Sequence, residues 1–227
     1  MLPGVRPIVL PIPETDNLVL IYEGPEDVVI SFRGTNNKAN LFTDANCLLI
    51  KHPAFHGLIH KGFADALNSL WPRLLAALPD NMAAKRFWVT GHSLGGALAI
   101  LAAFRLSMRA VRVTGVYTYG QPRVGSHRFC QAYDDLLRYQ TWRTTHPDDG
   151  VPLVPFMLGA YRHAGQHLML RPDSIVINPS LVRESVTLVK SLWQDFKRGH
   201  TFGLLYEHKS ALYVADLKNR YDLQNRA

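Results

Sequence analysis

A serine flanked by glycines is the residue of this sequence with the clearest capacity for chemistry. Residues 91–95 (GHSLG) fit the pattern G-x-S-x-G, between a run typical of a strand, Arg86–Thr90, and a run typical of a helix, Leu94–Met108. A tight turn from strand to helix strains the serine backbone and lifts its oxygen out of the sheet, and flanking glycines remove the clashes. The pattern therefore favours Ser93 as a nucleophile over Ser93 as a simple helix N-cap.

The same turn supplies one half of an oxyanion hole. The backbone N–H of Leu94 lies at the expected helix start, where developing negative charge is stabilised. The second N–H must follow an earlier strand. Thr35 comes directly after the apolar run Asp27–Arg33 and Gly34, so it can offer both its N–H and its hydroxyl. We therefore expect Leu94 and Thr35 to hold the oxyanion.

A serine nucleophile needs a base, and the base needs a carboxylate that orients it. Around such a turn the chain order is serine, acid, histidine. Asp148 and Asp149 follow the run Tyr139–Thr145, which predicts a strand, and catalytic groups gather at the carboxyl ends of strands in open α/β sheets. Only one of the pair can orient the base, and the pattern leaves open which. Further candidate acids after the serine are Asp134, Asp135, Asp173, Glu184 and Asp195.

Two late histidines compete for the role of base, His200 and His208. His208 comes just before a run that predicts a short helix, Ser210–Leu217, and a loop there can hold an imidazole over the strand ends. His200 lies between Gly199 and Thr201, in a turn that would expose it. The sequence therefore prefers His208.

Three earlier histidines are spaced as on one helical face, which raises the possibility of a metal site. His52, His56 and His60 recur every four residues, but Pro53 and Gly57 break any helix there and the chain has no HExxH motif. We therefore expect no metal and no cofactor.

Composition excludes several other classes of protein. The 227 residues are 47% hydrophobic and 19% charged, which rules out a disordered chain. The net charge is +7, but lysine and arginine are scattered rather than gathered in a basic run. We therefore expect no nucleic-acid partner. No composition shift divides the chain, so a single domain over residues 1–227 fits best.

Apolar runs with strand character alternate with runs of helical period. Strands are predicted at Asn17–Glu23, Asp27–Arg33, Arg86–Thr90, Val113–Tyr119, Tyr139–Thr145 and His167–Leu170. Helices are predicted at Lys61–Leu78 (with a kink or break at Pro72), Leu94–Met108, Ser126–Leu137, Ser180–Phe196 and Ser210–Leu217. This alternation argues for an α/β fold around a largely parallel sheet.

These residues resemble the class 3 lipases, the fungal-type triacylglycerol lipase family of the α/β-hydrolase superfamily. The resemblance runs from Val28 to Tyr213. GHSLGG alone occurs in many hydrolases, whereas FRGT, HKGF and GQPRVG in this order are far more specific. The motifs that carry the resemblance are VVISFRGT, IHKGF, GHSLGGALA, TYGQPRVG, DGVP, RHAG and EHKSALY.

The resemblance implies a choice at each open position. The family's acid lies two residues before Val-Pro, which matches Asp149 and not Asp148. The family's base precedes a helix near the C-terminus, which matches His208. Its oxyanion residue follows FRG, which matches Thr35. Family members often cover the site with a lid after this motif, and here the lid would consist of Asn36–Ala45. His163, in RHAG, matches a position that we interpret as structural.

Several positions depart from the family pattern. His146 stands where the family commonly has Asn, and Leu41 stands where it often has Trp in the lid region. Cys47 and Cys130 do not reproduce the disulfides of secreted fungal members, so we expect buried thiols. Residues 1–13 contain four prolines and no long apolar core, unlike a secretory signal. A compact bacterial-type or intracellular relative is expected, cytoplasmic rather than secreted.

The expected activity is that of a serine carboxylester hydrolase acting on lipid esters through an acyl-enzyme. Phospholipase A1 or short-chain esterase activity on the same fold is the alternative, and a catalytically silent binding module is a more remote one. The expected partners are the lipid or ester substrate and, transiently, a lipid surface. The oligomeric state is left open.

Overall fold

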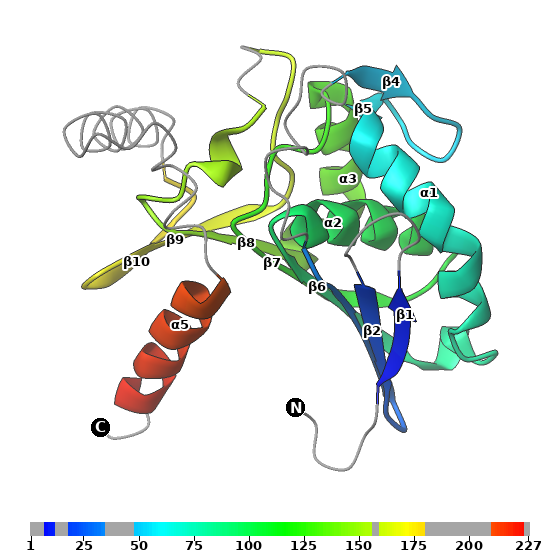
Figure 1. The fold of residues 1–227 in the computed structure, drawn as a ribbon, viewed down its shortest axis with the longest axis horizontal. Helices are drawn as coiled ribbons and strands as arrows, with labels where there is room; N and C mark the ends of the chain where they lie inside the picture. Colours follow the sequence, from blue (N-terminus) through cyan, green and yellow to red (C-terminus); the bar gives the residue numbers. More distant parts are fainter. Residues whose placement is uncertain (1–6, 12–17, 35–47, 156–158, 180–209, 225–227) are drawn as a thin grey trace.

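The computed structural model describes residues 7–11, 18–34, 48–155, 159–179 and 210–224 (Figure 1). Predictions that fall on other residues therefore lie outside the described part of the chain. They are the helix Ser180–Phe196, the lid at Asn36–Ala45, and the roles of Thr35, Leu41, Cys47, His200 and His208.

An eight-stranded sheet forms the centre of the fold, with strands in the order β1-β2-β3-β6-β7-β8-β9-β10. The five strands β3, β6, β7, β8 and β9 run parallel, while β1, β2 and β10 pair antiparallel at the two ends. The predicted mostly parallel sheet is confirmed. The bounds are β1 (Ile8–Pro11), β2 (Leu18–Glu23), β3 (Asp27–Phe32), β6 (Arg86–His92), β7 (Val113–Tyr119), β8 (Thr141–Thr145), β9 (Gln166–Arg171) and β10 (Ser174–Ile177).

The helices agree with the sequence periodicity except at α1 and α5. The bounds are α1 (Lys61–Ala76), α2 (Leu94–Ser107), α3 (His127–Leu137) and α5 (Ser210–Gln224), with short 3₁₀ turns at Met82–Ala84, Arg138–Gln140 and Val151–Leu153. Of the kink or break predicted at Pro72, the break does not occur, because α1 continues through this residue. Pro72 is exposed, and Leu70, Trp71 and Leu74 on either side of it are buried. Core packing therefore outweighs the one missing backbone hydrogen bond. At the other end of the chain, α5 extends beyond the predicted Leu217.

Helices cover the two faces of the sheet unequally. α1, α2 and α3 lie on one side, and α5 lies on the other (Figure 1). The buried apolar side chains of the described residues form one core beneath the first three helices, with Phe32, Phe63, Phe87, Phe104 and Phe129 among its largest members. α2 is buried along almost its whole length, which fits its alanine-rich sequence. It begins directly at the carboxyl end of β6.

A small hairpin, β4 (Leu49–Lys51) and β5 (Leu58–His60), lies beside the start of α1 (Figure 1). No helix among the described residues is long and apolar enough to cross a membrane.

Candidate active site

Ser93 occupies the sharp turn between β6 and α2. Its backbone angles are φ 60° and ψ −129°, in a region that residues with a side chain rarely adopt. Its side chain makes no capping hydrogen bond to α2, whereas its carbonyl oxygen accepts from Gly96 N at 2.9 Å. The turn is fixed from the sheet side too, because Ser93 N–H donates to Tyr119 O at 2.9 Å. The strained backbone thus presents a buried hydroxyl that does not cap the helix.

The flanking glycines are required by close backbone contacts. A Cβ at Gly91 would lie 2.2 Å from the carbonyl oxygen of Gly95, and a Cβ at Gly95 would lie 2.1 Å from that of Phe32. Gly34, just beyond β3, approaches the turn as well, since a Cβ there would lie 3.2 Å from the Cβ of Ser93. The chain therefore leaves β3 beside Ser93. Thr35, the next residue, lies outside the described part.

Leu94 is the first residue of α2, and its side chain is buried. The N–H groups of a first helical turn have no acceptor within their own helix, and the helix dipole adds positive potential there. The backbone N–H of Leu94 is thus suited to hold negative charge that develops beside Ser93.

Asp149 is the buried member of the acidic pair that follows β8. Its side chain is 3% exposed, whereas Asp148 is exposed. One carboxylate oxygen, Oδ1, accepts from Val151 N at 2.9 Å, and Oδ2 accepts from the hydroxyl of Tyr213 at 2.6 Å. A buried carboxylate held on both oxygens is suited to orient a third group.

Tyr213 reaches this carboxylate from the first turn of α5. It packs against three rings, at centroid distances of 4.6 Å from His146, 5.7 Å from His92 and 6.0 Å from Tyr119. Its hydroxyl also accepts from His146 N at 3.1 Å. Burial, and next the charge of Asp149, raise the pKa of Tyr213 well above its ordinary value, so the hydroxyl remains a donor.

The start of α5 is therefore attached to the strand end that carries Asp149. This contact was not foreseen from the sequence, although Tyr213 closes the EHKSALY motif. The family pattern also marked His146 only as a departure. In the structure its backbone N–H donates to Tyr213, and burial lowers the pKa of its imidazole.

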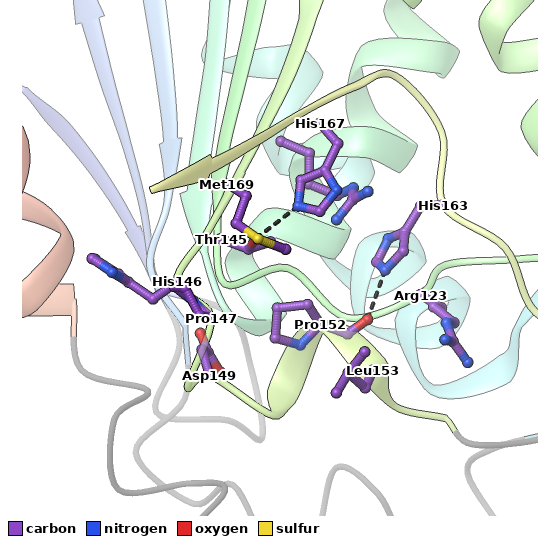
Figure 2. A pocket seen from close by; sticks show the side chains of 11 residues that line it. Arg123, Thr145, His146, Pro147, Asp149, Pro152, Leu153, His163, His167 and Met169 are labelled. Carbon is purple, nitrogen blue, oxygen red and sulfur yellow. Dashed lines mark hydrogen bonds between the residues drawn. The ribbon is translucent and has the colours of Figure 1, made fainter. Parts of the chain in front are cut away.

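A small cavity of about 30 Å³ lies beside Asp149 (Figure 2). His163 Nε2 donates to the carbonyl oxygen of Pro152 at 2.6 Å, and burial lowers the pKa of His163 well below its ordinary value. His167 Nε2 and Thr145 Oγ1 lie 2.7 Å apart. The neutral His163 thus tethers the turn that follows Asp149, and this contact supports the structural role expected for it.

Ser93 and Asp149 lie at the same edge of the sheet. β6 and β8 are separated only by β7, with His92 paired to Tyr119 and Tyr119 to Thr144. Neighbouring strands lie about 4.8 Å apart, so the two strand ends are about 10 Å apart. An imidazole between them is of the right size to link a serine hydroxyl to a carboxylate. His208, which precedes α5 by two residues, lies outside the described part.

Two of the three early histidines have structural positions. His60 begins α1, with Nδ1 accepting from Phe63 N at 3.4 Å, and His52 lies 2.8 Å from the amide of Asn68. No cluster of three or more His, Cys, Asp or Glu residues suited to a metal occurs in the described ranges. Cys130 is a free, buried thiol, and burial raises its pKa to about 12.

Comparison with known proteins points to one family. The family described as Lipase (class 3) matches residues 29–159, more than half of the chain. A lipase of Rhizomucor miehei is 31% identical over 170 residues, which cover 71% of this chain and 46% of the relative. Secreted mono- and diacylglycerol lipase 1 of Fusarium solani is 35% identical over 156 residues, covering 64% and 44%. The chain spans less than half the length of these two relatives.

A solved structure agrees in fold. It is a triacylglycerol lipase whose catalytic centre is formed by a serine protease triad. It superposes with a TM-score of 0.66 at 27% identity, covering 76% of this chain and 69% of that one. The α/β-hydrolase fold expected from the sequence is thereby confirmed.

Proposed function

Because the chain belongs to the class 3 lipase family, we propose that it is a serine carboxylester hydrolase that cleaves lipid esters through an acyl-enzyme. The observation that carries this proposal is the conformation of Ser93. Ser93 is held at φ 60°, which strains its backbone, and its hydroxyl does not cap the helix that follows. Such strain is found where a nucleophile must be presented.

In the proposed reaction, Ser93 Oγ attacks the acyl carbonyl carbon while His208 takes its proton. The carbonyl double bond becomes an oxyanion, which the N–H groups of Leu94 and Thr35 stabilise, each by about 3 kcal/mol. The intermediate collapses to the acyl-enzyme, and His208 protonates the leaving alcohol. Water, activated by the same imidazole, then releases the acid and restores Ser93.

Asp149 is assigned the orienting role. Its burial and its hydrogen bonds from Val151 N and the Tyr213 hydroxyl fix the carboxylate in place. A carboxylate so placed selects the imidazole tautomer and stabilises the imidazolium. Asp148 is exposed and serves as a loop residue.

One sequence relationship and one structural contact support His208 as the base. It precedes α5 by two residues, and Tyr213 on the first turn of α5 donates to Asp149. The attachment of α5 to Asp149 limits how far residue 208 can lie from that carboxylate, because five residues span at most about 18 Å even when fully extended. His200, eight residues earlier, is less constrained.

The proposed substrates are acylglycerols, with transient contact at a lipid surface. Two names support this class: the Fusarium solani relative is a mono- and diacylglycerol lipase, and the solved neighbour is a triacylglycerol lipase. Phospholipase A1 or short-chain esterase activity is the alternative. A silent binding module is disfavoured by the strained serine and the buried, fully held Asp149.

A substrate panel tests the proposal. Fatty acid release is measured from emulsified triolein, from phosphatidylcholine vesicles and from a soluble short-chain p-nitrophenyl ester, with wild-type protein and Ser93→Ala. The proposal expects turnover of triolein that the variant lacks. Hydrolysis of phosphatidylcholine alone, or of the soluble ester alone, would assign the alternative activities. Activity retained by a correctly folded Ser93→Ala protein would refute the assigned nucleophile.

A further inference from the structure

A second, larger cavity lies far from Ser93, at the carboxyl end of α2. Its volume is about 280 Å³. Its walls come from the turn between β4 and β5, from Trp71 on α1, and from Arg105, Met108 and Arg109 around the end of α2. Because α2 starts beside Ser93 and rises about 1.5 Å per residue, the cavity is about 20 Å from the candidate active site. It is therefore a separate feature of the molecule.

Two arginines bring positive charge to this cavity. Arg105 donates to Asn68 Oδ1 at 3.0 Å, and its guanidinium lies 4.0 Å above the ring of Trp71. Neither partner carries a negative charge. Arg109 follows one helical turn later and is exposed, with no ion pair among the described residues. Burial, and next the charge of Arg109, lower the pKa of Arg105.

Within the described ranges, no Asp or Glu side chain lines the cavity. The carbonyl groups at the end of α2 favour positive charge here. They explain the presence of arginine, but they explain neither the hollow nor its apolar walls. An anion bound between the two guanidinium groups would relieve their mutual repulsion.

Most of the remaining wall is apolar, and the exposed His56 adds one polar side chain to it. Trp71 is 6% exposed and Phe55 is 8% exposed, so only a small part of each residue is accessible. The ring of Phe55 packs against Phe104 and Phe129 at centroid distances of 5.8 and 5.9 Å, which anchors this wall in the core. Met108 is 54% exposed at the rim. The cavity thus combines an apolar wall with a cationic rim.

We propose that this cavity binds a small organic anion with an apolar tail, of which a medium-chain carboxylate is the representative. Its head pairs with Arg105 and Arg109, and its tail lies against Phe55, Trp71 and Met108. A guanidinium presents paired N–H donors that match a carboxylate. An inorganic anion would satisfy the charges but leave the apolar wall against water, and a neutral alcohol would do the reverse. The volume is just below the range of about 300–1,000 Å³ for drug-sized ligands, which favours a short tail.

Methionine methyl groups give a direct test, because one lies in each cavity. Met108 lines this cavity, and Met169 lines the small one beside Asp149. In protein labelled with ¹³C at the methionine methyl groups, octanoate is titrated and compared with octanol and acetate. We expect the Met108 signal to shift saturably with octanoate, and at least tenfold higher concentrations to be needed for the other two ligands. A shift of Met169 without Met108 would place the ligand at the candidate active site and overturn the proposal.

Charge variants complete the test. Arg109→Gln removes an exposed guanidinium and is expected to weaken octanoate binding about tenfold, the usual effect of one charge-assisted hydrogen bond. The matched control is Arg112→Gln, which removes an exposed arginine that does not line the cavity and should leave binding unchanged. The proposed anion site would be overturned if Arg109→Gln bound octanoate as tightly as the wild type does. It would also be overturned if octanol bound as tightly as octanoate.

The Ser93→Ala protein separates this proposal from the proposed function. It is expected to bind octanoate at Met108 as the wild type does, whether or not the wild type hydrolyses esters. Loss of the Met108 response in that variant would show that the two sites are one and would overturn the proposal.

Discussion

The hydroxyl of Tyr213 donates a hydrogen bond to Oδ2 of Asp149 at 2.6 Å, across 64 positions of sequence. The same hydroxyl accepts from His146 N at 3.1 Å. One buried side chain therefore links α5 to both ends of the segment His146–Asp149, which follows β8. Because burial keeps the tyrosine protonated, it supplies Asp149 with a permanent donor.

Tyr213→Phe tests this link. Removal of the hydroxyl leaves a buried carboxylate oxygen and a backbone N–H with one partner fewer, so the free energy of unfolding should fall by about 2 kcal/mol. The carboxylate would then hold an imidazolium more strongly and raise the pKa of the proposed base. Since the base must be neutral to act, the acid limb of the kcat/KM profile should move to higher pH, and kcat should fall about tenfold.

Tyr139→Phe is the control, because it removes the hydroxyl of a tyrosine that is 77% exposed. Urea denaturation and a pH–rate profile measure both effects. A Tyr213→Phe protein with lower stability but an unchanged pH profile would give Tyr213 a structural role only.

Asp149→Asn and Asp148→Asn distinguish the two neighbouring acids. Asp149 is buried and held on both oxygens, whereas Asp148 is exposed. An amide at the orienting position stabilises the wrong imidazole tautomer, so Asp149→Asn should lose about 10⁴-fold in kcat. Asp148→Asn should stay close to wild type. Kinetics on a soluble ester measure both, and the reverse order of losses would move the acid by one residue.

The sequence predicted the regular part of the fold because periodicity and burial agree there. β7 has the predicted bounds, and β6 and α2 differ from theirs by one or two residues. The edge strands β1 and β10 were missed, since four residues with mostly exposed side chains carry no clear alternation. The hairpin strands β4 and β5 have three residues each, too short for a periodic signal.

The candidate site also contains residues that the sequence predicts and contacts that it does not. Ser93 was predictable because local geometry demands the two glycines around it, and the contacts of Gly91 and Gly95 bear this out. Choosing Asp149 over Asp148 needed the family resemblance, since a strand end alone does not say which of two neighbours turns inward. The bond from Tyr213 to Asp149 is long-range, and no local pattern encodes it.

Gly95→Ala should show how tightly the turn is packed. A Cβ there would lie 2.1 Å from the backbone oxygen of Phe32, which cannot move without displacing β3. We expect a loss of about 3 kcal/mol or more in the free energy of unfolding, or no folded protein. Gly24→Ala is the control, because its nearest contact would be an ordinary 3.5 Å from Asp27 O. Equal stability of the two variants would contradict the close approach.

His60 should make stability depend on pH. Burial lowers its pKa from 6.5 to about 4, its Nε2 has no partner among the described residues, and its ring stacks on Phe63 at 3.8 Å. As pH falls below 6.5 the unfolded chain takes up this proton first. The stabilisation is therefore complete above pH 6.5 and is lost as pH falls towards 4, by about 2–3 kcal/mol at pH 4.5.

Urea denaturation at pH 7 and pH 4.5 measures this dependence. His60→Asn keeps a capping side chain for α1 but removes the titration, so its stability should fall less between the two pH values. His127→Asn, which replaces an exposed histidine, should behave as the wild type does. An identical pH dependence in His60→Asn would exclude His60 as its source.

The base is the last assignment to test, with His208 and His200 as the candidates. If His208 takes the proton of Ser93, His208→Ala should reduce activity to the level of Ser93→Ala, while His200→Ala should keep most of it. The double variant Ser93→Ala, His208→Ala should be no worse than either single variant, because residues that act as one unit do not contribute additively. The neutral imidazole also requires that wild-type kcat/KM decrease as pH falls through the pKa of that histidine in the free enzyme. Initial rates on a soluble p-nitrophenyl ester compare the wild type with the four variants. A His208→Ala protein with near wild-type turnover would refute His208, and a matching loss in His200→Ala would assign the base to His200.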